Sequence, residues 1–311
     1  ARIEVPVQNG AVMLPSLGAA AADGGTAVVR NPATGPADVV SAGRRVSVPP
    51  DPHNDAPGWS GLRRIATGRL DTLVDDVDPF RMPAAQQLAP RLSTGRVGTW
   101  AATFGEAWPL LDRHHSNVAA EVEAAVKVIV PLEPGPRGPV SSSAPEAFGA
   151  VAMSQPPDPR TLAMTLTHEL QHLKLSALLD VTPLTLPDDG RRFYAPWRDD
   201  PRPADALLQG AYAFLGVSGF WGRQRLHEEG AAAIRAHTEY ARWRAAATLA
   251  TGTLRSSGCL TSQGMDFVQA MGGTLRSWQA EPVPEQALAL AQQQDQEHRD
   301  RWQAVHGAIP A

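Results

Sequence analysis

The spacing of apolar and polar positions predicts strands near the amino terminus. Apolar residues alternate with polar ones over residues 3–7, and the alternation resumes after the pair Asn9-Gly10. A period of two is typical of strands, and Asn-Gly is a favoured turn between two strands of a hairpin. Further short β-branched segments follow, separated by connections rich in proline and glycine. Residues 1–80 are therefore predicted to form a small β-rich region.

Beyond residue 80, apolar positions recur every three or four residues, which is typical of amphipathic helices. Helices are predicted at about 93–111, 161–180, 204–221, 224–250, 262–271 and 285–306. A strand at 148–154 is predicted directly before the second of these helices. It either belongs to the core or pairs with an extended peptide through its backbone. The predicted fold is α+β: a small N-terminal β-region packed on a mostly helical, metallopeptidase (zincin)-like core, residues 81–311, as one cooperative unit.

The helix predicted at 161–180 carries the clearest chemical signal, and Asp158-Pro159 is predicted to supply its N-cap and first residue. It contains His168-Glu169-Leu170-Gln171-His172, an H-E-x-x-H motif. Residues four apart share one face of a helix, so the two imidazoles can bind one metal ion, with Glu169 beside it. The alternative is a helix with two unrelated histidines. Two imidazoles suit zinc, iron, copper or nickel, so the motif names neither the metal nor the reaction.

A third metal ligand has to come from elsewhere in the chain. His237 on the helix predicted at 224–250 is the first candidate, with Glu239 as the alternative, since zinc and iron accept imidazole or carboxylate. An inward His237 brings Arg244 inward too, because both lie on one helical face. Gln209, on the preceding helix, is a candidate for contact with a ligand rather than with the metal.

The loop that follows the motif helix, residues 183–203, combines aromatic and charged residues. Tyr194, Arg198 and Arg202 are candidates for binding a cofactor, although Asp199 and Asp200 are also obvious partners for the two arginines. A buried arginine beside the metal is not needed by a peptidase. It suits an enzyme that binds 2-oxoglutarate, whose distal carboxylate a guanidinium can hold through two hydrogen bonds.

Composition narrows the class of protein. The 311 residues are 43% hydrophobic and 19% charged, which is typical of a globular protein with a sizeable core. A net charge of −4 without a basic tract argues against nucleic acid as a partner. The single cysteine, Cys259, cannot form an internal disulfide, which fits a reducing compartment.

Segments that would direct the chain to a membrane are not evident. No run of 18 apolar residues is present, so no membrane span is expected. The first residues, ARIEVPVQNG, lack the basic and apolar regions of a signal peptide. A cytoplasmic protein is therefore expected.

Several segments together resemble a known family. The segments are THELQHLKLSALLD, RRFYAPWRDDPRP, QGAYAFLGVSGFW and HTEYARWRA, with AFGAVAMS and GWSGLRRI elsewhere in the chain. They resemble the HExxH-motif peptide-modifying family encoded beside radical-SAM peptide maturases in gene clusters for ribosomally synthesised peptides. Members of that family are described as iron- and 2-oxoglutarate-dependent peptide β-hydroxylases.

The resemblance implies a function and a set of partners. It implies that His168 and His172 bind Fe(II), that Glu169 is an active-site residue and that 2-oxoglutarate is the cosubstrate. It also implies a ribosomally made precursor peptide as substrate and, as a further partner, a radical-SAM maturase. Two alternatives stay open: a zinc metallopeptidase that uses Glu169 as general base, and a peptide-binding module with a structural metal. The single cysteine argues against the last.

Overall fold

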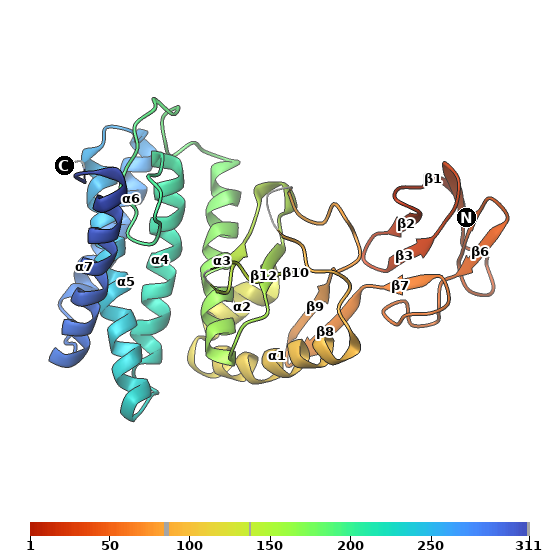
Figure 1. Cartoon of the computed structure of the whole chain (residues 1–311), viewed down its shortest axis with the longest axis horizontal. Coiled ribbons are helices and arrows are strands. Elements are labelled where there is room, and N and C mark those ends of the chain that lie inside the picture. The colour runs from red at the N-terminus through yellow and green to blue at the C-terminus, as the bar shows by residue number, and fades with distance from the viewer. Residues whose placement is uncertain (84–86, 137, 310–311) are drawn as a thin grey trace. The chain divides into compact units, whose positions relative to one another are not determined.

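The computed structural model describes residues 1–83, 87–136 and 138–309. Over these residues the protein is α+β, with strands first and helices afterwards (Figure 1), which confirms the predicted fold class at that level. The chain divides into two compact units. We call Ala1–Pro109 with Glu123–Leu162 the β-rich unit, and Leu110–Val122 with Ala163–Ala311 the helical unit. None of the described helices is long and apolar enough to cross a membrane.

The first seven strands of the β-rich unit form two antiparallel sheets. One has the order β1-β4-β5-β6 and consists of Arg2–Pro6, Thr26–Arg30, Asp38–Ser41 and Arg44–Ser47. The other has the order β2-β3-β7 and consists of Ala11–Leu14, Gly18–Ala21 and Trp59–Gly61. Small apolar residues from both sheets pack around Trp59, whose side chain is 2% exposed. The two sheets therefore share one hydrophobic core.

The Asn9-Gly10 turn forms, but the hairpin predicted around it does not. Asn9 and Gly10 have φ angles of 51° and 74°, and Gln8 and Ala11 exchange two backbone hydrogen bonds across them. Strand β1 then pairs with β4, whereas β2 pairs with β3. An isolated hairpin buries little apolar surface, and pairing in two sheets lets both strands cover the common core.

A third sheet, also in the β-rich unit, leads to the motif helix. Its order is β11-β12-β10-β9-β8, formed by Ser141–Ser142, Ala150–Ser154, Val128–Leu132, Leu70–Val74 and Arg63–Thr67. Strand β10 is parallel to both β9 and β12, and the outer pairs are antiparallel. The predicted strand before the motif is thus confirmed as β12. Segments from both sides of residue 80 pair in this sheet.

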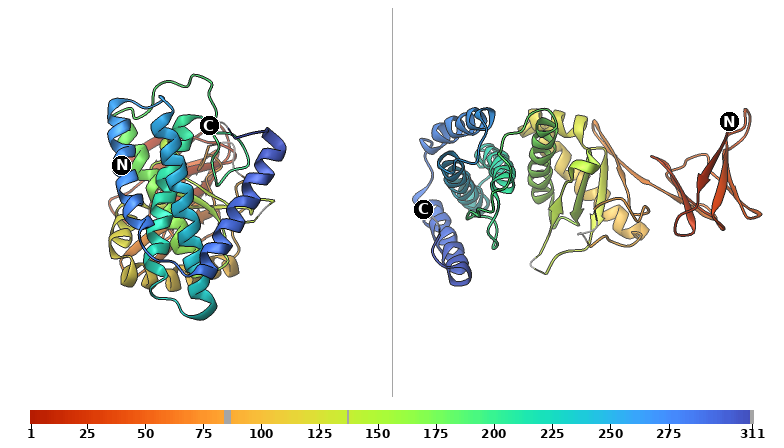
Figure 2. Two further views of the ribbon diagram at one scale, coloured as in Figure 1. Left: turned by 90° about the vertical axis from the view of Figure 1, so that its left-hand side faces the viewer. Right: turned by 90° about the horizontal axis from the view of Figure 1, so that it is seen from above.

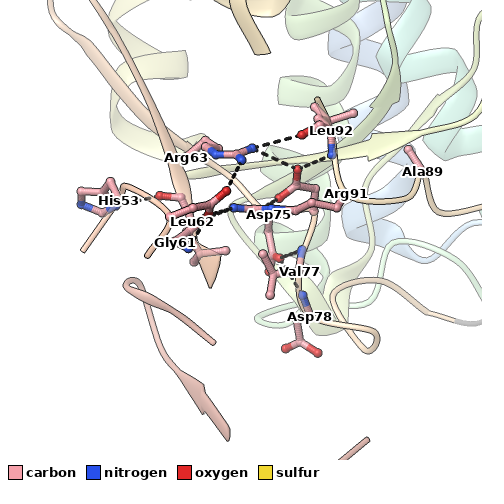
Figure 3. A network of polar contacts seen from close by, with 12 residues as sticks. His53, Gly61, Leu62, Arg63, Asp75, Val77, Asp78, Ala89, Arg91 and Leu92 are labelled. Carbon is pink, nitrogen blue, oxygen red and sulfur yellow. Dashed lines mark hydrogen bonds and ion pairs between the residues drawn. The ribbon is translucent and has the colours of Figure 1, made fainter. Parts of the chain in front are cut away.

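A network of charged groups joins distant segments of the β-rich unit (Figure 3). The Asp76 carboxylate is fully buried and forms an ion pair with Arg91. It also accepts a hydrogen bond from the backbone N–H of Leu92 at 2.8 Å. Arg91 and Arg63 also bind the Asp55 carboxylate, at 2.5 and 2.6 Å. A buried carboxylate is costly unless it is paired, so these arginines stabilise the position of Asp76.

Three helices begin or end within the β-rich unit. They are α1 (Thr94–His114), α2 (Ser116–Ala125) and α3 (Pro159–Leu179). Helix α3 contains the H-E-x-x-H motif and starts as predicted. The Asp158 carboxylate accepts hydrogen bonds from the Thr161 N–H at 2.9 Å and from its hydroxyl at 2.7 Å. This side-chain cap satisfies an N–H that has no partner within the helix.

The helical unit is a bundle in which α5 packs against α4, α6 and α7 (Figures 1 and 2). These helices are α4 (Ala204–Gln224), α5 (Gly230–Ser256), α6 (Ser262–Gln279) and α7 (Glu285–His306). The last was predicted with the same bounds. Helix α5 begins six residues later than predicted, because α4 continues to Gln224 and Gly230 has a positive φ of 55°. The apolar core of this unit includes residues of α3, α4, α5 and α6.

Candidate metal site

The two motif histidines face each other on α3. Their Nε2 atoms are 3.1 Å apart, and the rings meet edge to face with centroids separated by 4.8 Å. An ion about 2.0–2.1 Å from each of two nitrogens, at an angle of about 90–110°, requires the nitrogens to lie about 3 Å apart. The spacing of His168 and His172 therefore fits two ligands of one metal ion.

A glutamine on α4 fixes the orientation of the second histidine. The Nδ1 atom of His172 lies 3.0 Å from Oε1 of Gln209. Since an amide oxygen only accepts hydrogen bonds, Nδ1 carries the proton and donates it. The lone pair of His172 is then on Nε2, the atom that faces His168. Metal-binding histidines commonly have such a partner on the other ring nitrogen.

The first histidine is held in its neutral form. Burial and, to a smaller extent, the neighbouring His172 lower the pKa of His168 to about 3. Its ring also lies edge-on to Phe214, with centroids 5.2 Å apart. Metal binding requires an unprotonated imidazole, and His168 is in that state at neutral pH.

Glu169 lies beside the histidine pair and is almost inaccessible to solvent. Its side chain is 1% exposed, and Oε1 is 4.0 Å from Nε2 of His168. A carboxylate in this position can accept a proton from, or orient, a molecule bound next to the histidines.

Three aromatic side chains from different segments gather next to His168. The Phe214 ring stacks against Trp197, with centroids 4.7 Å apart, and contacts Trp243 at 4.4 Å. We call Trp197, Phe214 and Trp243 the aromatic group. No spacing in the sequence marks these three residues as part of the site. The one sequence signal for this packing is Gly210 in α4. It leaves room for Trp197, because an added Cβ would lie 2.5 Å from the Trp197 indole.

The two candidates for a third ligand have different surroundings. Glu239 accepts a hydrogen bond from Trp243 Nε1 at 2.7 Å, and so it borders the aromatic group. His237 instead has its Nδ1 3.4 Å from a guanidinium nitrogen of Arg225. Among the described residues, no three side chains of histidine, cysteine, aspartate or glutamate form a group that could hold a metal ion.

Arg244 lies with His237, as the shared helical face predicted, but at the end of α6. It donates to the backbone carbonyls of Trp278 at 2.5 Å and Glu281 at 3.1 Å. Its guanidinium also lies 4.7 Å from the centre of the Tyr240 ring. This buried arginine is therefore bound to carbonyl groups at the end of α6 and just beyond it.

The loop candidates have partners of their own. Arg198 and Arg202 both bind Asp200, at 2.8 and 2.9 Å. Tyr194 is buried, and its hydroxyl lies 2.7 Å from Nδ1 of His298 on α7. Burial raises the pKa of Tyr194 to about 12, so the hydroxyl is protonated at neutral pH. In this structure the tyrosine fixes the loop to α7.

Comparison of the chain with models of known protein families finds no match, and comparison with curated proteins finds none either. The chemistry of the site therefore follows from its own geometry. Two imidazoles at the spacing of metal ligands, a buried carboxylate next to them and an aromatic border are the elements that the described residues supply.

Proposed function

We propose that this protein is an iron(II)- and 2-oxoglutarate-dependent hydroxylase that modifies a β-carbon in a ribosomally made precursor peptide. The resemblance of several sequence segments to peptide β-hydroxylases suggests the reaction. The observation that carries the proposal is the 3.1 Å separation of the His168 and His172 Nε2 atoms. A mixed sheet whose strand β12 directly precedes the motif helix supports a metallopeptidase-like core.

His168 and His172 would hold the iron, and we favour Glu239 over His237 as the third ligand. Glu239 borders the aromatic group through Trp243, whereas His237 contacts Arg225. Two histidines and one carboxylate are the ligand set of many non-haem iron oxygenases. To reach the metal, the Glu239 carboxylate would have to release the indole N–H.

The cosubstrate needs a cationic partner for its distal carboxylate. Arg242 borders the aromatic group, with its guanidinium 4.3 Å from the centre of the Trp243 ring. It forms an ion pair with Asp295 at 3.8 Å, which is longer than a hydrogen bond. Arg244, Arg198 and Arg202 already bind carbonyls or Asp200, which makes Arg242 the better candidate.

Bound iron would supply the reaction of dioxygen with 2-oxoglutarate, which yields succinate and carbon dioxide and leaves one oxygen atom for the substrate C–H bond. The protein's own residues orient the reactants. Gln209 fixes the tautomer of His172, and Glu169 is placed to orient water or substrate near His168. The aromatic group keeps the surroundings of His168 apolar, which limits side reactions with water.

A zinc metallopeptidase is the second candidate. The observation that favours it is the buried Glu169 next to His168, because a carboxylate adjacent to a zinc-bound water is the general base of such enzymes. In that case Glu169→Gln would abolish cleavage of a precursor peptide. A hydroxylase would keep metal and cosubstrate binding in the same variant.

One experiment separates the two enzymes. Protein purified without oxygen is loaded with Fe(II) and supplied with 2-oxoglutarate, oxygen and the precursor peptide encoded in the same gene cluster. The expected product gains one oxygen atom, as measured by mass spectrometry, with one succinate released per product. The His172→Ala variant serves as control and should form neither. Peptide cleavage supported by zinc alone, without 2-oxoglutarate, would show that the protein is a peptidase and not a hydroxylase.

A further inference from the structure

The helical unit contains a cavity that neither His168 nor His172 lines. Its volume is about 530 Å³, within the range of small-molecule sites. The last turns of α1 and α4, the turn after α4, and parts of α5 and α6 line it. The side chains that matter here are Arg113, His114, Arg223, His227, Tyr240 and Trp278.

Cationic and potentially cationic groups dominate the rim of this cavity. Arg113 and Arg223 are exposed, and Arg223 is oriented by a 3.5 Å hydrogen bond to the His114 carbonyl. The rings of His114 and His227 stack with centroids 3.9 Å apart. Burial, and after it the neighbouring His227 and Arg113, lower the pKa of His114.

The carboxylate in the lining is already engaged. Glu281 forms an ion pair with the buried Arg225 and accepts the Tyr240 hydroxyl at 2.9 Å. Arg225 also donates to the Pro282 carbonyl at 2.9 Å. Glu281 is therefore occupied by groups of the protein and does not neutralise the arginines at the rim.

The walls of the cavity are apolar and flat. Two glycines of α4 allow aromatic rings to lie against the helix backbone: an added Cβ would lie 3.2 Å from Trp278 at Gly219 and 2.8 Å from Tyr240 at Gly222. Tyr240 is 1% exposed, and its ring lies beneath the guanidinium groups of Arg225 and Arg244. The half-buried Trp278 therefore supplies the accessible aromatic surface. An aromatic surface accommodates a planar or aliphatic body, while the rim attracts negative charge.

Cations near helix ends have a simpler explanation, which covers only part of this arrangement. Arg113, His114 and Arg223 lie in the last turns of α1 and α4, where the helix dipole favours positive charge. The dipole accounts for each residue on its own helix. It does not account for two such ends meeting at one cavity with aromatic walls.

We propose that this cavity binds an organic anion that carries a carboxylate or a phosphate on a flat, apolar body. The guanidinium groups of Arg113 and Arg223 would bind the anionic end at the rim, since arginine forms paired hydrogen bonds with both groups. Trp278 would contact the body. Binding at this cavity does not require the metal, so this proposal can be tested independently of the proposed hydroxylase.

Phenyl phosphate and benzoate are suitable probes, because both combine a ring with an anion. Each is titrated into the whole protein, and the indole N–H resonance of Trp278, assigned by its loss in Trp278→Phe, is followed by NMR. Calorimetry gives the affinity in parallel. Phenyl phosphate should shift the resonance with a dissociation constant of about 1 mM or lower, and benzoate tests whether a carboxylate suffices. Phenol and inorganic phosphate, which each lack one half of the probe, should bind more weakly.

Two matched variants test the role of the rim. Arg223→Gln should weaken phenyl phosphate binding about tenfold or more, because it removes a charge-assisted hydrogen bond. Arg255→Gln removes an exposed arginine from the last turn of α5, outside the cavity, and should leave binding unchanged. The proposal is overturned if Trp278 does not respond to either probe at up to about 10 mM. Equal affinities for the two variants would overturn it as well.

Discussion

Two histidines of the helical unit each lie 3.0 Å from a glutamine Oε1, yet only one of them has its other ring nitrogen facing another histidine. His172 uses Nδ1 to contact Gln209, and its Nε2 faces His168. His115 uses Nε2 to contact Gln224, and its ring lies flat on Phe220 with centroids 4.4 Å apart. A histidine–glutamine bond can therefore orient a metal ligand only when the remaining ring nitrogen faces a second candidate ligand, as in the metal site that we propose.

The largest effect should follow from removing either imidazole. His172→Ala should abolish stoichiometric metal binding, because each ligand of such a site carries about 3–4 kcal/mol of the binding free energy. His115→Ala should leave the metal content unchanged and should only lower stability. Metal analysis after loading without oxygen measures both variants. If His172→Ala retains its full metal content, the proposed difference in metal binding between His172 and His115 is wrong.

The pH dependence of stability should reflect the buried His115. Burial lowers its pKa from 6.5 to about 4, although the bond to Gln224 acts in the opposite direction. Between these values the unfolded chain binds a proton that the folded protein does not, so stability decreases as the pH falls. His115 should contribute up to about 3 kcal/mol to this loss between pH 7 and pH 4.

Denaturant titrations at several pH values measure this contribution. The pKa of His168 is lowered too, so both histidines contribute to the pH dependence of wild-type stability. The difference between the wild type and His115→Gln isolates His115. Parallel pH profiles for the two proteins would show that His115 is not protected from protonation by folding.

The two glutamines should differ in their effect on the metal. Gln209→Leu should weaken metal binding about 10- to 100-fold, the usual cost of losing a hydrogen-bond partner of a ligand. Gln224→Leu, the matched control, should not change metal affinity, because its partner is His115. Competition with a metal chelator gives both affinities. A similar loss in both variants would mean that stability, rather than orientation of His172, limits binding.

The smallest expected effect on the metal comes from the spacing of α3 and α4. A Cβ at Gly216 would lie 2.5 Å from Cγ of Gln171, so Gly216→Ala should push the two helices apart. The His172–Gln209 bond would lengthen, and metal affinity should fall a few-fold, by about 1 kcal/mol. The His115–Gln224 bond lies elsewhere on α4 and should persist. Undiminished metal affinity would show that the bond tolerates the displacement.

Local sequence signals predicted the elements more reliably than their partners. The Asp158 cap and the bounds of α7 follow from short-range rules of helix formation, and the structure agrees with both. The turn at Asn9-Gly10 also formed, but the partners of β1 and β2 were wrong. The pairing of strands depends on a core that is assembled from distant residues, and the sequence of a turn does not determine that pairing.

The same limit applies to the candidate site. Helical periodicity correctly put His237 and Arg244 on one face, but it does not say which neighbour that face meets. In the structure the face meets the end of α6. Phe214 and Trp243 had no recognisable spacing relative to the motif, because their contacts arise only when α4 and α5 pack together.

The attachment of the loop at 183–203 to α7 has a consequence for protein synthesis. Tyr194 contacts His298, 104 residues later in the chain, and His306 bonds to the Asp199 carbonyl across 107 residues. At translation rates of about 5–20 residues per second, the loop is made about 5–20 s before its partners. During that interval its aromatic residues have no α7 to pack against. The nascent chain therefore acquires this part of the helical unit last.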